Sequence, residues 1–352
     1  MSLLDRDLLL RAPKVVLHDH LDGGLRPQTV LDLAAQVGHE PPTTDPDGLA
    51  AWFDQRGKGA DLGRYLQTFE HTVAVMQTPE ALERVARECV EDLDADGVVY
   101  AEVRFAPELA TAGGLTIPEV LEAIARGFAA GPPTITVRQI VCGMRQDDRV
   151  AEAFAAAADA RHLGVVGIDL AGPEEGFPAS QHAAAIATAR EAGLHVTLHA
   201  GEAAGVASIA DALDQGAERL GHGVRIVDDL SPGEHGTDLV GPVARRVLAG
   251  DVALEVCPTS NVHTGVVADV ADHPIARLRK AGFRVTLNTD NRLMSGVTAT
   301  SEFVTMAEAF GMGPAEFEGM TLAAMESAFL EDEQARGALV EQIQRGYAAL
   351  RP

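Results

Sequence analysis

The residues that point most directly to chemistry are histidines spaced for metal binding. His18 and His20 stand two residues apart within one apolar run that is typical of a β-strand. Because alternate strand residues face the same side, both imidazoles would point one way and Asp19 the other. His199 and Asp290 follow two later apolar runs and could supply further ligands. Three imidazoles and one carboxylate leave room for a water, which is typical of a catalytic rather than a structural zinc site.

The residue types leave the identity of the metal open, because manganese, iron and cobalt also accept these ligands. Some barrel hydrolases hold two metals with a carboxylated lysine at the end of the fourth strand. This chain has lysine only at positions 14, 58 and 280, and Asp169 stands at the end of its fourth apolar run. One metal ion is therefore expected.

Two residues near these ligands could move protons. Glu202 follows His199 by three residues, so it can reach the site without sharing the ligand face, and it suits a general acid and base. The alternative is that Glu202 has only a structural role in the first turn of a helix, where the helix dipole favours a glutamate. His222 lies between Gly221 and Gly223, which allow close approach, and it could orient a water or stabilise negative charge. The alternative is that His222 only packs at the end of a strand.

The other residues with reactive side chains receive no functional assignment. The remaining histidines lie outside the strand ends or on predicted helices, at positions 39, 71, 162, 182, 195, 235, 263 and 273. Pro173-Glu-Glu175 is expected to form a solvated loop, and Arg245-Arg246 a surface pair. The cysteines at 89, 142 and 257 are odd in number and far apart, so they are expected to be reduced core residues of a cytoplasmic protein.

The elements that must position these residues follow a repeated pattern, in which β-branched apolar runs alternate with helical stretches. The runs predicted as strands are Lys14–His20, Gly97–Phe105, Thr134–Gly143, Gly164–Leu170, His195–Ala200, Leu220–Ile226, Val252–Cys257 and Arg284–Asn288. Helices are predicted between them, for example at Pro79–Asp94, Pro118–Phe128, Gln181–Ala192, Ser208–Gln215 and Leu239–Ala249. Eight strands with eight connections predict an α/β fold, a closed (β/α)₈ TIM barrel whose catalytic groups gather at the carboxyl ends of the strands. An open doubly wound sheet is the alternative, but no Gly-x-Gly-x-x-Gly follows any run.

Two parts of the chain exceed this repeat. Residues 21–96, after the first strand, hold about three helical stretches, and one of them is Asp61–Met76. Its apolar residues at helical spacing favour a helix packed on the barrel, with a wall over the site mouth as the alternative. The tail Pro314–Pro352 predicts one or two further helices, and no linker composition precedes it. Residues 1–352 are therefore expected to form a single barrel domain with extra helices after strand 1 and at the C-terminus.

The composition limits the partners. The 352 residues include 28 Lys plus Arg against 52 Asp plus Glu, a formal net charge of −24. This acidic surface repels phosphate backbones and anionic membranes, so neither nucleic acid nor a membrane is expected as a partner. No apolar stretch approaches the ~20 residues that span a bilayer, and early charged residues argue against an export signal. A neutral or cationic small molecule fits this charge, whereas the oligomeric state is left open.

Together the strand ends resemble the adenosine deaminase family of metal-dependent barrel hydrolases, over about Lys14 to Phe310. The matching motifs are Lys-Val-Val-Leu-His-Asp-His-Leu-Asp-Gly (14–23), Ala-Glu-Val-Arg-Phe-Ala-Pro (101–107), Gly-Ile-Asp-Leu-Ala-Gly (167–172), Leu-His-Ala-Gly-Glu (198–202), Gly-His-Gly (221–223), Cys-Pro-Thr-Ser-Asn (257–261) and Asn-Thr-Asp (288–290). Each motif is weak alone, but their order makes the set highly specific. The His-x-Glu and Pro-Cys-x-x-Cys pair of the cytidine-type zinc deaminases is incomplete here.

The resemblance implies a purine nucleoside as substrate and one Zn²⁺ per chain. The zinc ligands that it implies are His18, His20, His199 and Asp290. It further implies that Glu202 protonates the purine ring and that His222 lies beside the attacking hydroxide. By the same resemblance, Asp22 would bind ribose hydroxyls, the backbone of Gly172 would contact the purine, and His20 would also face the substrate. Hydroxide would add to C6 of adenosine or 2′-deoxyadenosine, and ammonia would leave.

One departure from the family bears on specificity. The family usually has Asn-Thr-Asp-Asp where this chain reads Asn288-Thr-Asp-Asn291, and its second acid contacts purine N7. Because N7 accepts hydrogen bonds, a carboxyl must be protonated to donate to it, whereas the Asn291 amide donates at any pH. Deamination of free adenine or another 6-aminopurine nucleoside is therefore the alternative. AMP ranks lower because no Arg and Lys cluster marks a phosphate site. A catalytically inactive purine-binding barrel would lack a ligand or Glu202, and none is missing.

Overall fold

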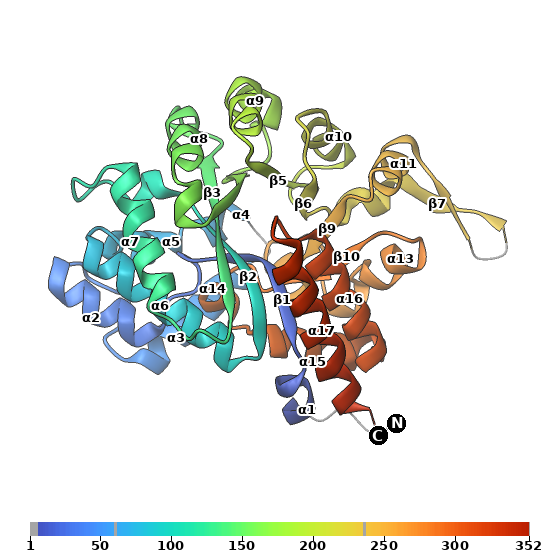
Figure 1. The fold of residues 1–352 in the computed structure, drawn as a ribbon, viewed down its shortest axis with the longest axis horizontal. Coiled ribbons are helices and arrows are strands. Elements are labelled where there is room, and N and C mark those ends of the chain that lie inside the picture. The colour runs from blue at the N-terminus through green and yellow to red at the C-terminus, as the bar shows by residue number, and fades with distance from the viewer. Residues whose placement is uncertain (1–5, 60–61, 235–236, 352) are drawn as a thin grey trace.

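The computed structural model describes residues 6–59, 62–234 and 237–351. Within these residues eight parallel strands run in the order β1-β2-β3-β4-β5-β6-β9-β10 (Figure 1). Their bounds are β1 Lys14–His20, β2 Val98–Phe105, β3 Thr136–Met144, β4 Val165–Ala171, β5 His195–Ala200, β6 Arg219–His222, β9 Ala253–Val256 and β10 Val285–Leu287. A parallel bridge between Asp19 and Asp290 joins the first strand to the segment after the last. The predicted (β/α)₈ barrel is confirmed.

The strand bounds agree with prediction to within two residues, except in the sixth strand. Leu220–Ile226 was expected, but β6 ends at His222 and a 3-10 helix follows at Val224–Asp229. His222 and Gly223 both adopt left-handed backbone conformations, with φ of 61° and 67°. These two consecutive residues cannot continue an extended strand, and they turn the chain at the mouth of the barrel.

Helices follow the strands along the chain, and most of them wrap the outside of the barrel (Figure 1). Their bounds are α6 Pro79–Ala95, α7 Ile117–Ala129, α8 Val150–Asp159, α9 Ala183–Glu191, α10 Val206–Asp214, α11 Pro242–Ala249, α12 Pro258–His263, α13 Ile275–Lys280, α14 Arg292–Ser295 and α15 Ala299–Phe310. The expected helix Leu239–Ala249 starts only at Pro242. Its first residues belong to β8 (Asp238–Val240), which pairs antiparallel with β7 (Leu230–Pro232) in a projecting hairpin that was not predicted (Figure 1).

The segment after β1 contains more helices than expected. Within its described residues it forms α2 Pro27–Val37, α3 Pro46–Gly57, α4 Leu62–Leu66 and α5 Phe69–Val75 before α6. The single helix expected over Asp61–Met76 is thus two short helices, and Asp61 lies outside the described residues. They separate at Thr68, whose hydroxyl donates to the carbonyl of Tyr65 at 2.6 Å. Such side-chain bonds to the backbone compete with a continuous helix.

The two ends of the described chain are helical. A short helix, α1 (Arg6–Arg11), precedes β1, and the tail forms α16 (Pro314–Ser327) and α17 (Glu333–Leu350). Ile343 and Tyr347 of α17 are buried, and the Tyr347 hydroxyl lies 3.1 Å from that of Thr321 on α16. The extra helices expected at the C-terminus therefore pack onto the fold.

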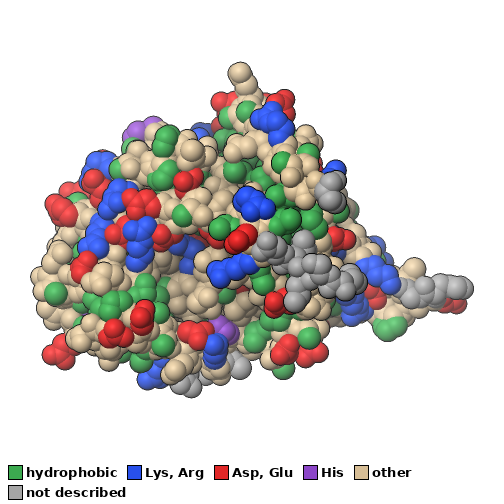
Figure 2. Space-filling model, turned by 90° about the horizontal axis from the view of Figure 1, so that it is seen from below, with side chains coloured by type: hydrophobic (Ala, Val, Ile, Leu, Met, Phe, Trp, Pro, Cys, Tyr) green, Lys and Arg blue, Asp and Glu red, His purple; other side chains and the backbone are tan. Residues whose placement is uncertain are grey.

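The surface carries mixed charge. On the face shown in Figure 2, Lys and Arg side chains lie among Asp and Glu side chains and form no continuous basic area. None of the helices in the described part of the chain combines the length and the apolar character needed to cross a bilayer.

Candidate active site

The four side chains that were expected to hold a metal come together at the carboxyl ends of β1, β5 and β10. Each offers one ligand atom, and the atoms of His18, His20, His199 and Asp290 all lie within 4.8 Å of one another. Oδ1 of Asp290 lies 3.4 Å from Nε2 of both His18 and His20. Asp290 has a positive φ of 59°, a strained conformation that recurs at functional sites.

The carboxylates behind the cluster favour metal binding. Oε2 of Glu255 lies 3.0 Å from Nδ1 of His18, and Oδ2 of Asp169 lies 2.8 Å from Nδ1 of His199. Carboxylates at Nδ1 hold the ring proton there and leave Nε2 as the free ligand atom. Burial and the nearby Arg104 lower the pKa of His18 to about 4, so its ring is neutral. Its buried Nε2 has no hydrogen-bond partner among the described residues, and the donor set fits a divalent metal ion.

A buried ionic network supports these carboxylates inside the barrel. Arg104 donates to Asp169 at 2.7 Å and to Glu255 at 2.6 Å. Arg219 donates to Glu255 at 2.7 Å and to Glu102 at 2.6 Å. Burial by itself raises the pKa of Asp169, but the charges of His199 and Arg104 reverse this and leave the pKa below its usual range. This network was not predicted from the sequence, although charged residues within otherwise apolar strands indicate buried ion pairs.

A cavity of about 340 Å³ opens beside the metal-binding cluster. The other residues expected at the site all line it: Asp22, Gly172, Glu202, His222 and Asn291. Its apolar wall includes Leu62, Tyr65, Leu66, Phe69 and Val73 from α4 and α5. Tyr65 is only 2% exposed. The segment formed by α4 and α5 therefore packs on the barrel and also forms a wall over the site, so the two alternative interpretations of this segment both apply.

Glu202 lies within reach of the cluster and of His222. Its Oε2 is 3.5 Å from Nε2 of His222, and its Oε1 accepts a hydrogen bond of 2.8 Å from the hydroxyl of Thr264. Burial raises the pKa of Glu202, although the nearby His222 opposes this effect. A raised pKa keeps more of the carboxyl protonated near neutral pH, which suits a proton donor.

The loop that carries Glu202 is held by a residue that was assigned to solvent. Glu174 is 5% exposed, so the expectation of a solvated loop is wrong for it, whereas Glu175 is exposed. The Glu174 carboxylate accepts hydrogen bonds from the backbone N–H groups of Gly201, Glu202, Ala203 and Ala204 and from the hydroxyl of Ser208. Consecutive N–H groups converging on one carboxylate form an anion-binding nest. Because its partners are mostly backbone groups about thirty residues away, side-chain spacing gave no signal for Glu174.

The glycines around His222 permit its close approach to the cluster. A Cβ atom at Gly221 would lie 3.0 Å from Cα of His199, a contact that ordinary Cβ atoms avoid. Gly223 follows in a left-handed conformation and turns the backbone away. This local geometry brings the His222 ring centroid to 4.8 Å from that of His18.

The remaining expected residues lie at the pocket wall with different surroundings. Burial, with smaller contributions from Asp290 and Glu108, raises the pKa of Asp22 to about 7. Gly172 has a φ of 91°, and a Cβ atom there would meet the Gln146 side chain at 2.3 Å. The Asn291 amide nitrogen, which was expected to face purine N7, donates to Oδ1 of Asp290 at 2.8 Å. Hydrogen bonds to an ionised carboxylate are stronger than those between neutral groups.

Comparison with known proteins identifies the family. The family model for adenosine deaminase matches residues 13–345. An adenosine deaminase from Mycolicibacterium vanbaalenii is 49% identical over 353 residues, covering 98% of both chains. One from Mycobacterium tuberculosis is 49% identical over 348 residues, covering 96% of this chain and 95% of that one. A solved adenine deaminase from Arthrobacter aurescens has a TM-score of 0.84 at 27% identity, covering 95% of this chain and 98% of that chain. The chain belongs to the adenosine deaminase family.

Proposed function

We propose that this enzyme deaminates adenosine and 2′-deoxyadenosine by hydrolysis, giving inosine or 2′-deoxyinosine and ammonia. The observation that carries the proposal is one cavity where a four-ligand metal cluster meets the buried carboxyl of Glu202. A largely apolar pocket with a few convergent polar groups is the usual form of a small-molecule site. The family relationship supports the same reaction.

We assign one zinc ion per chain to the ligand cluster. The ligands would be His18, His20, His199 and Asp290. Three imidazoles with one carboxylate form a donor set that zinc favours. When bound, the ion supplies a Lewis acid that makes hydroxide available from water near neutral pH.

The protein's own residues would handle the substrate. Glu202 would give its proton to ring nitrogen N1 while a water oxygen adds to C6. One proton of that water would restore Glu202 and the other would pass to the amino nitrogen, so that the bond from C6 to this nitrogen breaks, ammonia leaves and the C6 carbonyl forms. His222 would stabilise the incoming oxygen from the side of Glu202. Asp22 would bind the ribose hydroxyls, and the backbone of Gly172 would contact the purine ring. Asn291 and His20 would complete the wall around the base.

The charge of the pocket favours a nucleoside over a nucleotide. None of the described residues that line it is Lys or Arg, whereas Asp22, Glu70 and Glu202 contribute carboxyl groups. A phosphate would meet repulsion there and no cationic partner. Free adenine is the second candidate, because the similar Arthrobacter structure is an adenine deaminase. The wall residue Asp22 favours the ribose-bearing substrate.

An absorbance assay tests the proposal. The purified enzyme is mixed with adenosine, 2′-deoxyadenosine, adenine or AMP, with and without prior chelator treatment, and the absorbance near the adenosine maximum is followed. We expect rapid loss with the two nucleosides, abolished by the chelator and restored by zinc. Turnover confined to adenine would favour the second candidate. No turnover despite one bound metal per chain would contradict both and favour a binding role.

We also propose that the enzyme is cytoplasmic and that residues 1–352 form one domain. Cys89, Cys142 and Cys257, all within the described residues, are buried and unpaired, which suits a reducing compartment. The packing of α17 on α16 supports a continuous core.

A further inference from the structure

A chain of buried polar side chains leads from the reaction centre to the backbone of α13. Nδ1 of His222 lies 3.1 Å from Nδ2 of Asn261, and Oδ1 of Asn261 lies 3.1 Å from Nε2 of His273. The backbone N–H of Ile275 donates to Nδ1 of His273 at 3.1 Å. The side chains are almost inaccessible, since His222, Asn261 and His273 are 1%, 0% and 3% exposed. Sequence reasoning assigned no role to His273.

The hydrogen bonds that link His222, Asn261 and His273 have only one consistent direction. The N–H of Ile275 can only donate, so Nδ1 of His273 accepts. Burial and the nearby His222 lower the pKa of His273 to about 4, which keeps its ring neutral. A neutral ring carries one proton, so that proton is on Nε2 of His273 and is donated to Oδ1 of Asn261.

The direction continues through the amide to the site. With Oδ1 of Asn261 turned to His273, the amide nitrogen faces His222 and donates to its Nδ1. Because Nδ1 of His222 accepts this hydrogen bond, the ring proton of His222 is on Nε2, the atom that lies 3.5 Å from Oε2 of Glu202. One backbone N–H in α13 thus determines which nitrogen of His222 is protonated.

We infer that Asn261 and His273 are positioning residues that fix the tautomer of His222, so that its Nε2–H faces the reaction centre as a hydrogen-bond donor. The inference rests on the proposed function, which makes this cavity a deamination site. In this tautomer the His222 ring presents an N–H and no lone pair toward the substrate, so it does not remove a proton there. It stabilises the oxygen that adds to C6, and the proton transfers fall to Glu202.

A matched set of variants reverses or preserves the donor-to-acceptor direction of these hydrogen bonds. Asn261→Asp keeps the shape of the side chain but replaces the amide donor with an acceptor, so Nδ1 of His222 must become protonated. His273→Leu removes the donor to Asn261, whereas His273→Gln keeps an N–H near the position of Nε2. We expect kcat to fall by about tenfold or more in Asn261→Asp and His273→Leu, with KM changing less than about threefold. His273→Gln should recover most of the lost rate.

The tautomer can be measured independently of activity. Long-range ¹H–¹⁵N correlation spectra of the zinc-loaded enzyme, labelled with ¹⁵N-histidine, distinguish rings protonated on Nε2 from those protonated on Nδ1. Spectra of His222→Gln and His273→Gln assign the two signals. We expect Nε2–H tautomers for both residues in the wild type and a protonated Nδ1 of His222 in Asn261→Asp.

Several outcomes would overturn the inference. One is a wild-type His222 protonated on Nδ1. Another is a loss of kcat in Asn261→Asp with an unchanged His222 tautomer, because that result indicates a merely structural role. If the variants fail to fold, the wild-type spectrum alone still decides the tautomer. A wild type that does not deaminate adenosine would count against the proposed function, while the spectrum would judge the hydrogen-bonded chain separately.

Discussion

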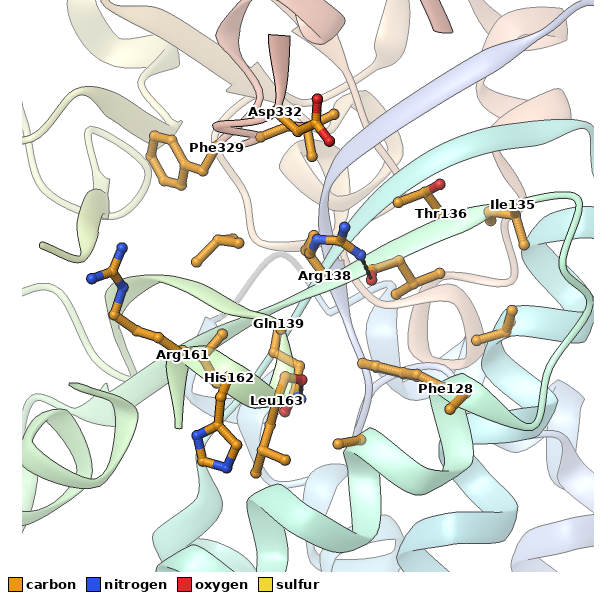
Figure 3. Close-up of a pocket in the computed structure, with 18 of the residues that line it drawn as sticks. Phe128, Ile135, Thr136, Arg138, Gln139, Arg161, His162, Leu163, Phe329 and Asp332 are labelled. Carbon is orange, nitrogen blue, oxygen red and sulfur yellow. Dashed lines mark hydrogen bonds between the residues drawn. The ribbon is translucent and has the colours of Figure 1, made fainter. Parts of the chain in front are cut away.

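The barrel has a cavity at each end, and the larger one is not where the reactive side chains converge. The cavity at the amino ends of β3, β4 and β5 has a volume of about 940 Å³, against about 340 Å³ for the cavity at the carboxyl ends. In the larger cavity Arg161 and His162 are neighbours in sequence, but their polar ends point in different directions (Figure 3). In the smaller cavity the ligand atoms of the metal cluster lie within 4.8 Å of one another.

The polar groups of the two cavities also differ in their partners. Arg161 contacts Glu331 at 3.3 Å, and Nδ1 of His162 lies 2.9 Å from the carbonyl of Asp159. At the carboxyl end, Nε2 of His18 and Oδ1 of Asp22 are buried without a hydrogen-bond partner among the described residues. Buried polar atoms without partners are costly, and several of them around one cluster of ligand atoms are typical of a site where a ligand supplies the missing contacts. Oε1 of Gln139, which lines the larger cavity, is also buried without a hydrogen-bond partner among the described residues. The convergence of several ligand atoms on one cluster, and not volume, therefore identifies the site.

The largest contrast should come from two histidines of the same strand. His199→Ala removes a ligand at the carboxyl end, so we expect loss of metal and at least about a thousandfold loss of activity. His195 lies at the opposite end of β5 and lines the larger cavity. His195→Ala should keep both metal and activity. Elemental analysis and adenosine turnover of both variants test this. A fully metallated, active His199→Ala protein would contradict the assignment of His199 as a metal ligand.

The second effect concerns the buried carboxyl group. Glu202→Gln keeps the shape of the side chain but cannot exchange a proton, so we expect turnover to fall by at least about a hundredfold while metal content stays normal. Glu331→Gln, at the amino-end cavity, is the control and should retain normal turnover. Near-normal turnover of Glu202→Gln would remove this residue from the mechanism.

A smaller effect is expected at the nest that holds the Glu202 loop. Glu174→Gln replaces a carboxylate oxygen by an amide nitrogen that cannot accept the converging N–H groups, so we expect kcat to fall by about ten- to a hundredfold. Unpaired backbone donors should also lower the free energy of unfolding by about 1–3 kcal/mol. The exposed neighbour provides the control, because Glu175→Gln should change neither quantity. Equal behaviour of the two variants in kinetics and denaturant unfolding would argue against the positioning role of Glu174.

The smallest effect is expected in the larger cavity itself. The ion pair of Arg161 with Glu331 joins side chains that are 44% and 66% exposed, so it is screened by solvent. We expect Arg161→Ala to change the free energy of unfolding by less than about 1 kcal/mol and to leave turnover unchanged. A large loss of turnover would show that the amino-end cavity takes part in function.

The barrel and the candidate cluster could be predicted because both depend on short-range rules. Side-chain alternation placed His18 and His20 on one face, and parallel strands bring the residues at their carboxyl ends together. The resemblance to known motifs added Asp22 and Gly172, which the structure places in the same cavity. Their roles stay predictions.

The features that were missed depend on contacts between distant segments. Glu174 binds backbone groups that begin 27 residues later, and the sequence does not show where their N–H groups point. Asn261 and His273 act through an amide orientation that only the three-dimensional neighbours fix. The sixth strand ends early because His222 and the residue after it adopt left-handed backbone conformations. An apolar run in the sequence does not show these conformations, so the predicted strand was too long.

A crystal structure of the zinc-loaded enzyme soaked with inosine would show directly whether the smaller cavity is the reaction site. We expect zinc anomalous signal among His18, His20, His199 and Asp290, with the purine between Gly172 and Glu202. We also expect that the amino-end cavity holds no nucleoside. Inosine bound at the amino end, or zinc at any other position, would contradict the assignment of the reaction to the smaller cavity.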